Sequence, residues 1–468
     1  MKKLLALVLV FVMLLATGCG AKQEPVETEA PAVNDAPTVN EETPEVDEDG
    51  LNDEPVEILF WAYSKWAGVT GTEPDGQTGD WEKAMAEKFM ELHPNVTVNV
   101  ELLDFSSGPE KVSIALANGQ AANVLHDSEA RMFSYANDGF LVPIGDYLTE
   151  EEVAEYYDGA LATTSIADGK AYYLPFGTAP MLMMVNKTLF EEAGCADLLP
   201  QNEERTWTFD EYYTAIKTAT ENLSGVYGVP LFANTTTGEI MTFQWIWNAG
   251  GRMVNADTAT MGINTDAAKT GLSFYKKLVD EGLAAPGGAG MKATDVWALF
   301  DQQIVLTAPA ATVHYARAVA AQAGGTASPF EIMLVQLPTA DGCVQATSGF
   351  PHGFAVFKNE DPNVEVWSIE FAKFLSNEEN AGAVKAANEF SFKKSQADMY
   401  VGSDDPNMAF AVAAMEHQIA NGTSVVGYTE LRNMISPYFE QFYLGQLSVD
   451  EFAEQVEKMG NEFLATKN

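Results

Sequence analysis

Val56-Glu-Ile-Leu-Phe-Trp61 is a short apolar run of the kind that forms a buried strand, and the segments after it decide the fold. A loop at 68–80 follows, and apolar residues then recur at helical spacing until Pro94 ends the pattern: Trp81, Met85, Phe89 and Leu92. Residues 96–103 alternate as a second strand. The body of the chain is therefore predicted to begin with a strand, a helix and a strand.

The alternation continues along the chain. Residues 111–116 predict another helix, and residues 122–125 predict another short strand. Strands joined by helices pair in parallel and carry the helices on the faces of the sheet. Three later stripes at helical spacing are predicted to face the core: Ala268, Leu272, Tyr275 and Val279; Trp367, Phe371, Phe374 and Leu375; Phe452, Val456, Met459 and Phe463.

Length and charge limit both the architecture and the partners. The chain has 468 residues, 47% of them apolar, which is more than one hydrophobic core usually holds, so two lobes are expected. Its formal charge of −41 repels nucleic-acid phosphates and anionic lipid headgroups, so neither is expected as a partner. Cys195 and Cys343 could pair in an oxidising exterior or remain two separate thiols.

The N-terminal segment has the pattern of an export signal. Lys2 and Lys3 precede an apolar run from Leu4 to Ala16, which is too short to span about 30 Å of hydrocarbon. Leu14-Leu-Ala-Thr-Gly-Cys19 resembles a bacterial lipobox. The resemblance implies a lipoprotein signal peptide at 1–18 and diacylglycerol on the sulfur of Cys19; the alternative is an ordinary secretory signal followed by a chance cysteine.

Residues 19–54 are predicted to form an acidic disordered tether. The segment lacks aromatic residues, recurs in Glu, Asp, Pro, Thr and Ala, and has Lys22 as its one base. So few apolar groups cannot offset the entropy of ordering the chain, and like charges keep it extended. An acidic interaction tail is the alternative.

Several stretches, taken in order, are similar to the family 1 extracellular solute-binding proteins of ABC importers, which are maltose-binding-protein-like. The stretches are Ile58–Trp61, Phe89–Val98, Ala115–Val124, Tyr135–Leu141, Asp168–Pro175, Met184–Phe190, Thr206–Tyr212, Gly349–Val356 and Gly445–Phe452.

The resemblance implies a type II periplasmic-binding-protein fold, or Venus flytrap. Two α/β lobes, each a mostly parallel sheet flanked by helices, close around a ligand by hinge motion. Mapped onto this chain, lobe one covers 55–181 plus 344–390, and lobe two covers 182–343 plus 391–468. The resemblance also implies an extracytoplasmic, lipid-anchored monomer that works with permease subunits, without a cofactor.

Ligands of open α/β sheets bind beyond the carboxyl ends of strands, and this rule selects the candidate ligand-binding residues. Candidates expected in or near lobe one are Trp61, Tyr63, Lys65, Trp66, His126, Asp127, Glu129, Arg131, Phe176, Phe350 and His352. Candidates expected in lobe two are Glu239, Phe243, Trp245, His314, Tyr315, Tyr428 and Arg432. Arg131 aligns with an arginine that contacts sugar in the family. Trp245 and Trp247 alternate on one predicted helix, so one of them is expected in the core.

These residue types favour a sugar or oligosaccharide. Aromatic faces pack on the C–H faces of sugar rings, and Asp, Glu, Arg and His hydrogen-bond to the hydroxyl groups. A peptide, polyamine or other cation is the alternative ligand, since the acidic body could aid capture of cations.

Two other function classes remain open. A secreted carbohydrate-active enzyme would need two carboxylates flanking a bond, for which Asp127 and Glu239 are the candidates. Metal binding through His126, His314 and His352 is the other, although their spacing matches no paired-ligand motif. No P-loop, Rossmann fingerprint or Gly-x-Ser-x-Gly motif is present.

Overall fold

The computed structural model describes residues 51–69, 73, 75–105, 107–233, 239–288, 291, 293–401, 403–419 and 422–467, without the side chains at 239–240 and 293–294. These residues belong to one compact unit. The predicted signal peptide, Cys19 and most of the tether lie outside the described residues.

The first sheet has the strand order β11-β4-β10-β3-β1-β2. Its strands are β1 (Val56–Ala62), β2 (Val96–Leu102), β3 (Val124–Ser128), β4 (Leu174–Thr178), β10 (His352–Val356) and β11 (Phe390–Ser391). Strand β1 pairs in parallel with β2 and β3, as the helix-linked order predicts. Strand β10 returns from the second half of the chain and runs antiparallel to both β3 and β4.

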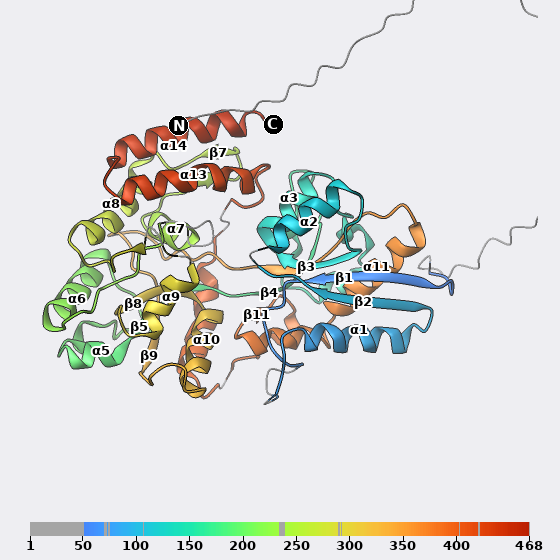
Figure 1. The fold of residues 1–468 in the computed structure, drawn as a ribbon, viewed down its shortest axis with the longest axis horizontal. Helices are drawn as coiled ribbons and strands as arrows, with labels where there is room; N and C mark the ends of the chain where they lie inside the picture. Colours follow the sequence, from blue (N-terminus) through green and yellow to red (C-terminus); the bar gives the residue numbers. More distant parts are fainter. Residues whose placement is uncertain are drawn as a thin grey trace, which may run out of the picture. The chain divides into compact units, whose positions relative to one another are not determined.

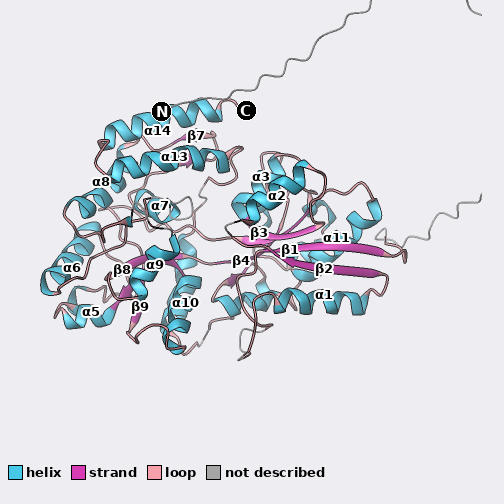
Figure 2. Ribbon diagram, viewed as in Figure 1, coloured by secondary structure: helices cyan, strands magenta, loops and turns pink. Residues whose placement is uncertain are grey.

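Helices cover both faces of this sheet (Figure 1, Figure 2). Helices α1 (Asp80–Leu92) and α11 (Pro362–Leu375) lie on one face, and α2 (Gly108–Ala117) and α3 (Glu129–Asn137) lie on the other. The faces alternate along β1, because Phe60 joins the core under α1 and α11 whereas Trp61 joins the core under α2 and α3. The predicted helix is confirmed through Leu92; Trp81, Met85 and Phe89 are buried, whereas Leu92 at the end of the helix is 63% exposed.

The second sheet has β5 (Met181–Asn186) between β8 (Thr307–Ala311) and β9 (Ile332–Val335). Strand β5 enters directly from β4 of the first sheet and runs antiparallel to both neighbours, which differs from the parallel pairing predicted. All six residues of β5 are buried, since helices enclose the sheet. A two-stranded ribbon, β6 (Val254–Asn255) and β7 (Thr260–Met261), packs against the C-terminal helix.

The helices around the second sheet build the largest hydrophobic core and, through α10 and α12, a separate smaller core. They are α5 (Lys187–Glu192), α6 (Phe209–Asn222), α7 (Glu239–Trp247), α8 (Asp266–Asp280), α9 (Ala293–Asp301), α10 (Thr312–Ala323), α12 (Pro406–Ala414), α13 (Tyr428–Tyr443) and α14 (Val449–Leu464). The predicted stripe of α8 is confirmed at Ala268, Leu272 and Tyr275, which are all buried. Capping boxes fix two helix starts, Thr208 with Glu211 at α6 and Ser448 with Glu451 at α14.

Short helices complete the described chain: η1 (Ile144–Tyr147), α4 (Glu150–Ala154), η2 (Leu161–Thr164), η3 (Ala196–Leu198), η5 (Ala381–Ala387), η6 (Lys394–Gln396) and η7 (Met415–His417). Among the described residues, no helix is long and apolar enough to cross a membrane. Cys195 and Cys343 are free thiols.

Two of the segments that cross between the sheets pair side by side. Phe350 donates its backbone N–H to Ala179 O, and Met181 donates to Ser348 O, so the segment between β4 and β5 pairs with the segment leading to β10. Thr347 and Ile419 extend this pairing, because Thr347 donates to His417 O and Ile419 donates to Thr347 O. The first sheet with its helices and the second sheet with its helices form the two halves of the body. The crossing segments hold these two halves together through backbone hydrogen bonds.

Candidate functional site

The residues after β1 and β3 lie together at the edge of the first sheet that faces the second. Parallel strands end at the same edge, and Tyr63 N donates to His126 O over 3.1 Å, which ties the two loops. Glu129 N in turn donates to Pro351 O on the crossing segment. We call the place where these loops meet the second half of the body the junction site.

Asp127 and Arg131 form a buried ion pair at the junction site. Arg131 Nε donates to both carboxylate oxygens of Asp127 over 2.9 Å, and Nη2 also bonds to Oδ1. Their i, i+4 spacing allows this contact because α3 begins between them. The Arg131 guanidinium lies 4.6 Å from the centre of the Tyr63 ring, and its side chain remains 24% exposed. Arg131 is thus oriented by Asp127 while one side stays accessible.

A chain of buried hydrogen bonds runs beside this pair. Glu389 Oε2 accepts from His352 Nε2 over 2.7 Å, so His352 Nδ1 accepts from His126 Nε2, also over 2.7 Å. Lys65 Nζ lies 3.2 Å from the other oxygen of Glu389. We call Glu389, His352, His126 and Lys65 the buried relay.

The protonation states of the buried relay follow from burial and from its one cation. Burial alone would raise the pKa of Glu389, but Lys65 and His352 outweigh burial and hold it at about 2. Burial and the Lys65 charge lower the pKa of His352, and burial with His352 lowers that of His126 well below its ordinary value. Both imidazoles are therefore neutral, and the relay consists of one carboxylate and one ammonium joined through neutral rings.

His314 approaches the relay from the second half of the body. Its Nδ1 accepts from Ala311 N over 3.1 Å, so in the neutral ring Nε2 carries the proton. Its ring stacks on Trp297, with 3.8 Å between centroids, and Phe350 lies 6.4 Å away. Burial, together with the charges of Arg317 and Lys65, lowers the pKa of His314 to about 3. His314 is therefore a neutral aromatic donor opposite Lys65.

Glu129 links the two halves on the other side of the junction site. It accepts from the Thr423 hydroxyl, and Asn137 Nδ2 donates to Ser424 O over 3.5 Å. Burial raises the pKa of Glu129 to about 7 even though the hydrogen bond to Thr423 lowers it. A hollow of about 320 Å³ lies against Glu129, Thr423 and Pro351.

A model of bacterial extracellular solute-binding proteins matches residues 74–382, which is more than half of the chain. The chain belongs to this family of solute-binding proteins. Its fold also matches solved two-lobed binding proteins, which confirms the predicted fold class.

The chain is similar over most of its length to other binding proteins, whose names give different ligands. A protein of Brucella abortus, named only as a binding protein, is 25% identical over 404 residues that cover 83% of this chain and 92% of the relative. The cyclic α-maltosyl-1,6-maltose binding protein from Arthrobacter globiformis has a TM-score of 0.70 at 22% identity, over 88% of this chain and 100% of that one. UgpB from Mycobacterium tuberculosis, solved with glycerophosphocholine, has a TM-score of 0.70 at 19% identity, over 88% of this chain and 98% of that one. The two structures show the same fold with different ligand classes.

Several predicted contact residues of the solute-binding protein are core residues in the structure. Phe243 and Trp245 are at most 1% exposed; Trp245 stacks on Tyr275 at 5.0 Å and Phe243 packs on Phe439. The structure therefore places both rings in the core, because α7 lies beneath α8 and α13. Trp247 is buried in the same core, so both tryptophans that alternate on this helix are core residues. The side chain of Glu239 lies outside the described residues.

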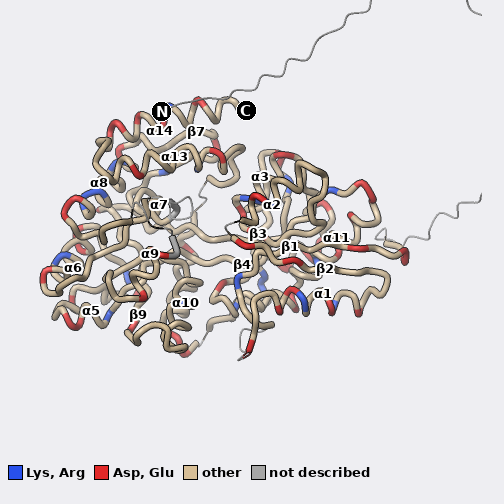
Figure 3. The backbone as a smooth tube through the Cα atoms, in the orientation of Figure 1, with Lys and Arg blue, Asp and Glu red and all other residues tan. Residues whose placement is uncertain are grey.

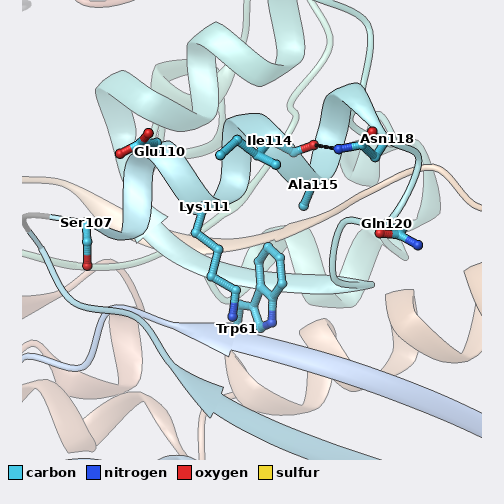
Figure 4. A pocket seen from close by; sticks show the side chains of 8 residues that line it. All are labelled: Trp61, Ser107, Glu110, Lys111, Ile114, Ala115, Asn118 and Gln120. Carbon is cyan, nitrogen blue, oxygen red and sulfur yellow. Dashed lines mark hydrogen bonds between the residues drawn. The ribbon is translucent and has the colours of Figure 1, made fainter.

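Trp61 also points away from the junction site. Its ring lies under α2, where Nε1 donates to Glu101 over 2.9 Å and the Lys111 ammonium lies 4.6 Å from the ring (Figure 4). A surface groove of about 470 Å³ lies above it, between α2 and the strand. Trp61 and Tyr63 share the face of the strand that α2 and α3 cover, and Trp61 lies farther from the carboxyl end of the strand.

Two further predicted residues, Trp66 and Phe176, pack against the histidines of the buried relay, whereas Tyr315 lies elsewhere. Trp66 packs on His126, His352 and Phe176 at ring distances of 5.6–6.1 Å, and both Trp66 and Phe176 are buried. Tyr315 binds Asp405 at 2.8 Å and so anchors α12 rather than facing the junction.

Tyr428, the first residue of α13, and Arg432, one helical turn later, lie close to α3. Tyr428 is 6% exposed at the start of α13, and the Arg432 guanidinium lies 5.9 Å from the Tyr428 ring. Helix α13 contacts α3, so these two residues flank the Glu129 side of the junction site.

Sequence reasoning missed Glu389, Trp297, Thr423 and Phe105. Phe105 is 53% exposed and its ring lies tilted against Tyr63, with 5.3 Å between centroids, so it adds an aromatic face at the rim of the junction site. Its position just after the second predicted strand was a usable signal. Glu389 and Trp297 had none, because only the folded chain brings them to His352 and His314.

The three predicted histidines are not arranged as the ligands of one metal ion. His126 and His352 bond to each other, and His314 bonds to its own backbone turn. Within the described part of the chain, no group of three or more His, Cys, Asp and Glu side chains is placed to hold a metal ion.

Proposed function

We propose that this protein is the substrate-binding lipoprotein of an ABC importer, and that it captures a sugar or oligosaccharide at the junction site. The observation that carries the proposal is the pairing of charge there. Arg131 is matched by Asp127, Lys65 is matched by Glu389, and His314 is neutral. Polar groups of zero net charge beside aromatic faces suit a polyhydroxylated, uncharged ligand.

A cationic ligand has less support. Acidic residues recur along helices of both halves of the body, but the described carboxylates at the junction site are already engaged (Figure 3). Glu129 bonds to Thr423, and with a pKa of about 7 it is largely protonated in mildly acidic surroundings. A polyamine would therefore have to break these existing pairs. Breaking a buried pair leaves a charge without its partner, which is strongly unfavourable.

Hinge closure is the proposed means of capture. The lobes would be 55–181 plus 344–390 and 182–343 plus 391–468, with the crossing segments as the hinge. A ligand that touches Arg131 in one lobe and His314 in the other would favour the closed population. Closed protein with bound solute would then be delivered to the permease, and the protein would act as a monomer without a cofactor.

The proposed ligand contacts are Phe105, Arg131, His314, Phe350, Tyr428 and Arg432, and the buried Tyr63 ring supports Phe105 and Arg131 from behind. The nearby Asp127 carboxylate is locked by Arg131, so it is poorly placed to act as the nucleophile or acid of a glycosidase. We therefore propose binding without hydrolysis, in keeping with a family of binding proteins. Intact oligosaccharide after incubation with stoichiometric protein is the expected result.

A calorimetric and tryptophan-fluorescence titration over mono- and oligosaccharides, amino acids and polyamines tests the ligand class. Saturable binding of a sugar that Arg131→Ala weakens supports the proposal. Binding of a polyamine or peptide alone, with no response across the sugars, refutes it.

The anchoring at Cys19 is a separate proposal, supported by the lipobox-like Leu14–Cys19 and the two lysines before the apolar run. Mass spectrometry of the mature N-terminus should find diacylglycerol on Cys19. In Cys19→Ala the protein should stay unlipidated; an unmodified Cys19 in the wild-type protein would refute the anchor.

A further inference from the structure

A hollow of about 510 Å³ lies on the far side of β4 from the junction site. Strand β4 pairs with β10 on one side and with β11 on the other, and the junction residues follow β1 and β3 beyond β10. The hollow is lined by both halves of the body, and its walls include Tyr157, Thr178, Phe390, Tyr400, Val412 and Gln418. It is therefore a second place where the two halves meet.

The walls of this hollow are mainly apolar. Phe390 and Tyr400 form a fixed aromatic corner, with ring centroids 4.9 Å apart at an angle of 60°. Tyr157 and Val412 are 42% and 36% exposed, so large apolar side chains border the hollow on both halves. Ligand sites commonly have this size, 300–1,000 Å³ by a rough rule, and combine apolar walls with a few polar groups.

The polar groups at the hollow are uncharged with one exception. Asp158 is the one acidic or basic residue among its lining, and that carboxylate pairs with Lys394 in solvent. The Thr178 hydroxyl is buried, and among the described residues it has no hydrogen-bond partner. A buried hydroxyl without a partner is costly, so a ligand or water that bonds to it is favoured.

We propose that this hollow is a second ligand site, for a small uncharged molecule with one or two rings and a hydroxyl group. The ring would pack on Phe390 and Tyr400, and the hydroxyl would bond to Thr178 once the neighbouring wall groups that close off its oxygen have moved. The site is separate from the proposed sugar site, so it does not depend on the identity of the transported solute.

A ligand bound in this second site is expected to affect the junction site through Glu389. Tyr400 donates its hydroxyl to the backbone carbonyl of Glu389 over 2.9 Å, and Phe390 is the next residue. The Glu389 carboxylate in turn holds Lys65 and His352. A molecule that shifts Tyr400 therefore shifts a residue that orients the junction site, and coupling between two sites is reciprocal.

The test uses benzyl alcohol, cyclohexanol and phenyl β-glucoside as probes, with benzoate and benzylamine as charged controls. Saturation-transfer NMR measures contact of each probe with the full-length protein. Ala397→Trp and Val412→Trp fill the hollow from its two exposed walls, and Ala409→Trp on the solvent side of α12 is the matched control. Thermal unfolding confirms that each variant is folded.

We expect transfer to the three uncharged probes that falls at least fivefold in both filling variants and is unchanged in Ala409→Trp. Transfer should also persist in Arg131→Ala, which separates this site from the proposed sugar site. Absence of transfer in the wild-type protein overturns the second site. Transfer that survives both folded filling variants also overturns it, whatever the sugar titrations show.

Discussion

Glu129 offers a sharp test of how the two halves of the body are held together. Its carboxyl group bonds to Thr423 across the junction site, and burial raises its pKa from 4.5 to about 7. The folded protein therefore binds a proton more tightly than the unfolded chain does. The stabilising contribution is complete below pH 4.5 and is lost as the pH rises through 7.

The difference of about 2.5 pKa units corresponds to about 3 kcal/mol between the two ends of this range. Glu129→Gln keeps an oxygen that can accept from Thr423 but removes the titration. The free energy of unfolding of the wild-type protein, relative to that of Glu129→Gln, should therefore fall by about 3 kcal/mol between pH 4.5 and pH 7.5.

Urea-induced unfolding, followed by tryptophan fluorescence at half-unit steps of pH, measures this difference. Glu110→Gln is the matched control, because Glu110 also lies in the first turn of a helix but is exposed. Its difference from the wild-type protein supplies the baseline for losing a carboxylate at such a position. A difference for Glu129→Gln that follows this baseline at every pH would refute the idea that Glu129 is protonated in the folded state.

Three other substitutions test the core, the relay and the ligand contact. Glu389→Gln leaves the Lys65 ammonium buried without its carboxylate and should lower the free energy of unfolding by about 3–5 kcal/mol at neutral pH, measured with urea; a loss below about 1 kcal/mol would contradict the relay. Because the pKa of Glu389 is held at about 2, the wild-type protein should lose this contribution only as the pH falls from 4.5 towards 2. Trp245→Ala should cost about 3–5 kcal/mol of stability and leave solute affinity unchanged in calorimetry; weaker binding in a folded variant would return this ring to the site. Arg131→Ala should weaken sugar binding by about 1–3 kcal/mol, and unchanged affinity would remove this residue from the proposed contacts.

Local patterns in the sequence were sufficient for three of the six strands of the first sheet, β1, β2 and β3. Residues 56–61 and 96–103 were predicted as strands and appear as β1 and β2, and the apolar spacing of Trp81, Met85 and Phe89 places a buried face on α1. These predictions hold because strand and helix periodicity depend on neighbours only a few positions apart. The pairing of β5 with β8 and β9 depends on where a crossing segment enters the sheet, which local periodicity does not encode.

The candidate site divides in the same way. Asp127 and Arg131 were both selected by sequence, and their i, i+4 spacing across the start of α3 brings them into contact. Glu389 is 324 residues from Lys65 and 37 from His352, so no local pattern could reveal the buried relay. Trp245 was predicted as a ligand contact and is buried in the core, because an apolar stripe on α7 has the same pattern whether it faces ligand or core. Whether this stripe faces ligand or core depends on how α8 packs against α7.

The paired crossing segments restrict how the two halves of the body can move. Strands β4 and β10 are hydrogen-bonded to each other in the first sheet, and the bonds from Phe350 to Ala179 and from Met181 to Ser348 carry that ladder on to β5. The two segments therefore form a continuous antiparallel ribbon and cannot flex as independent linkers. A two-stranded ribbon bends and twists about its own axis far more easily than it shears, because shear would break its cross-strand bonds. Any rotation between the halves should follow a single preferred axis, and the stiffness of that ribbon sets how far thermal motion can carry it.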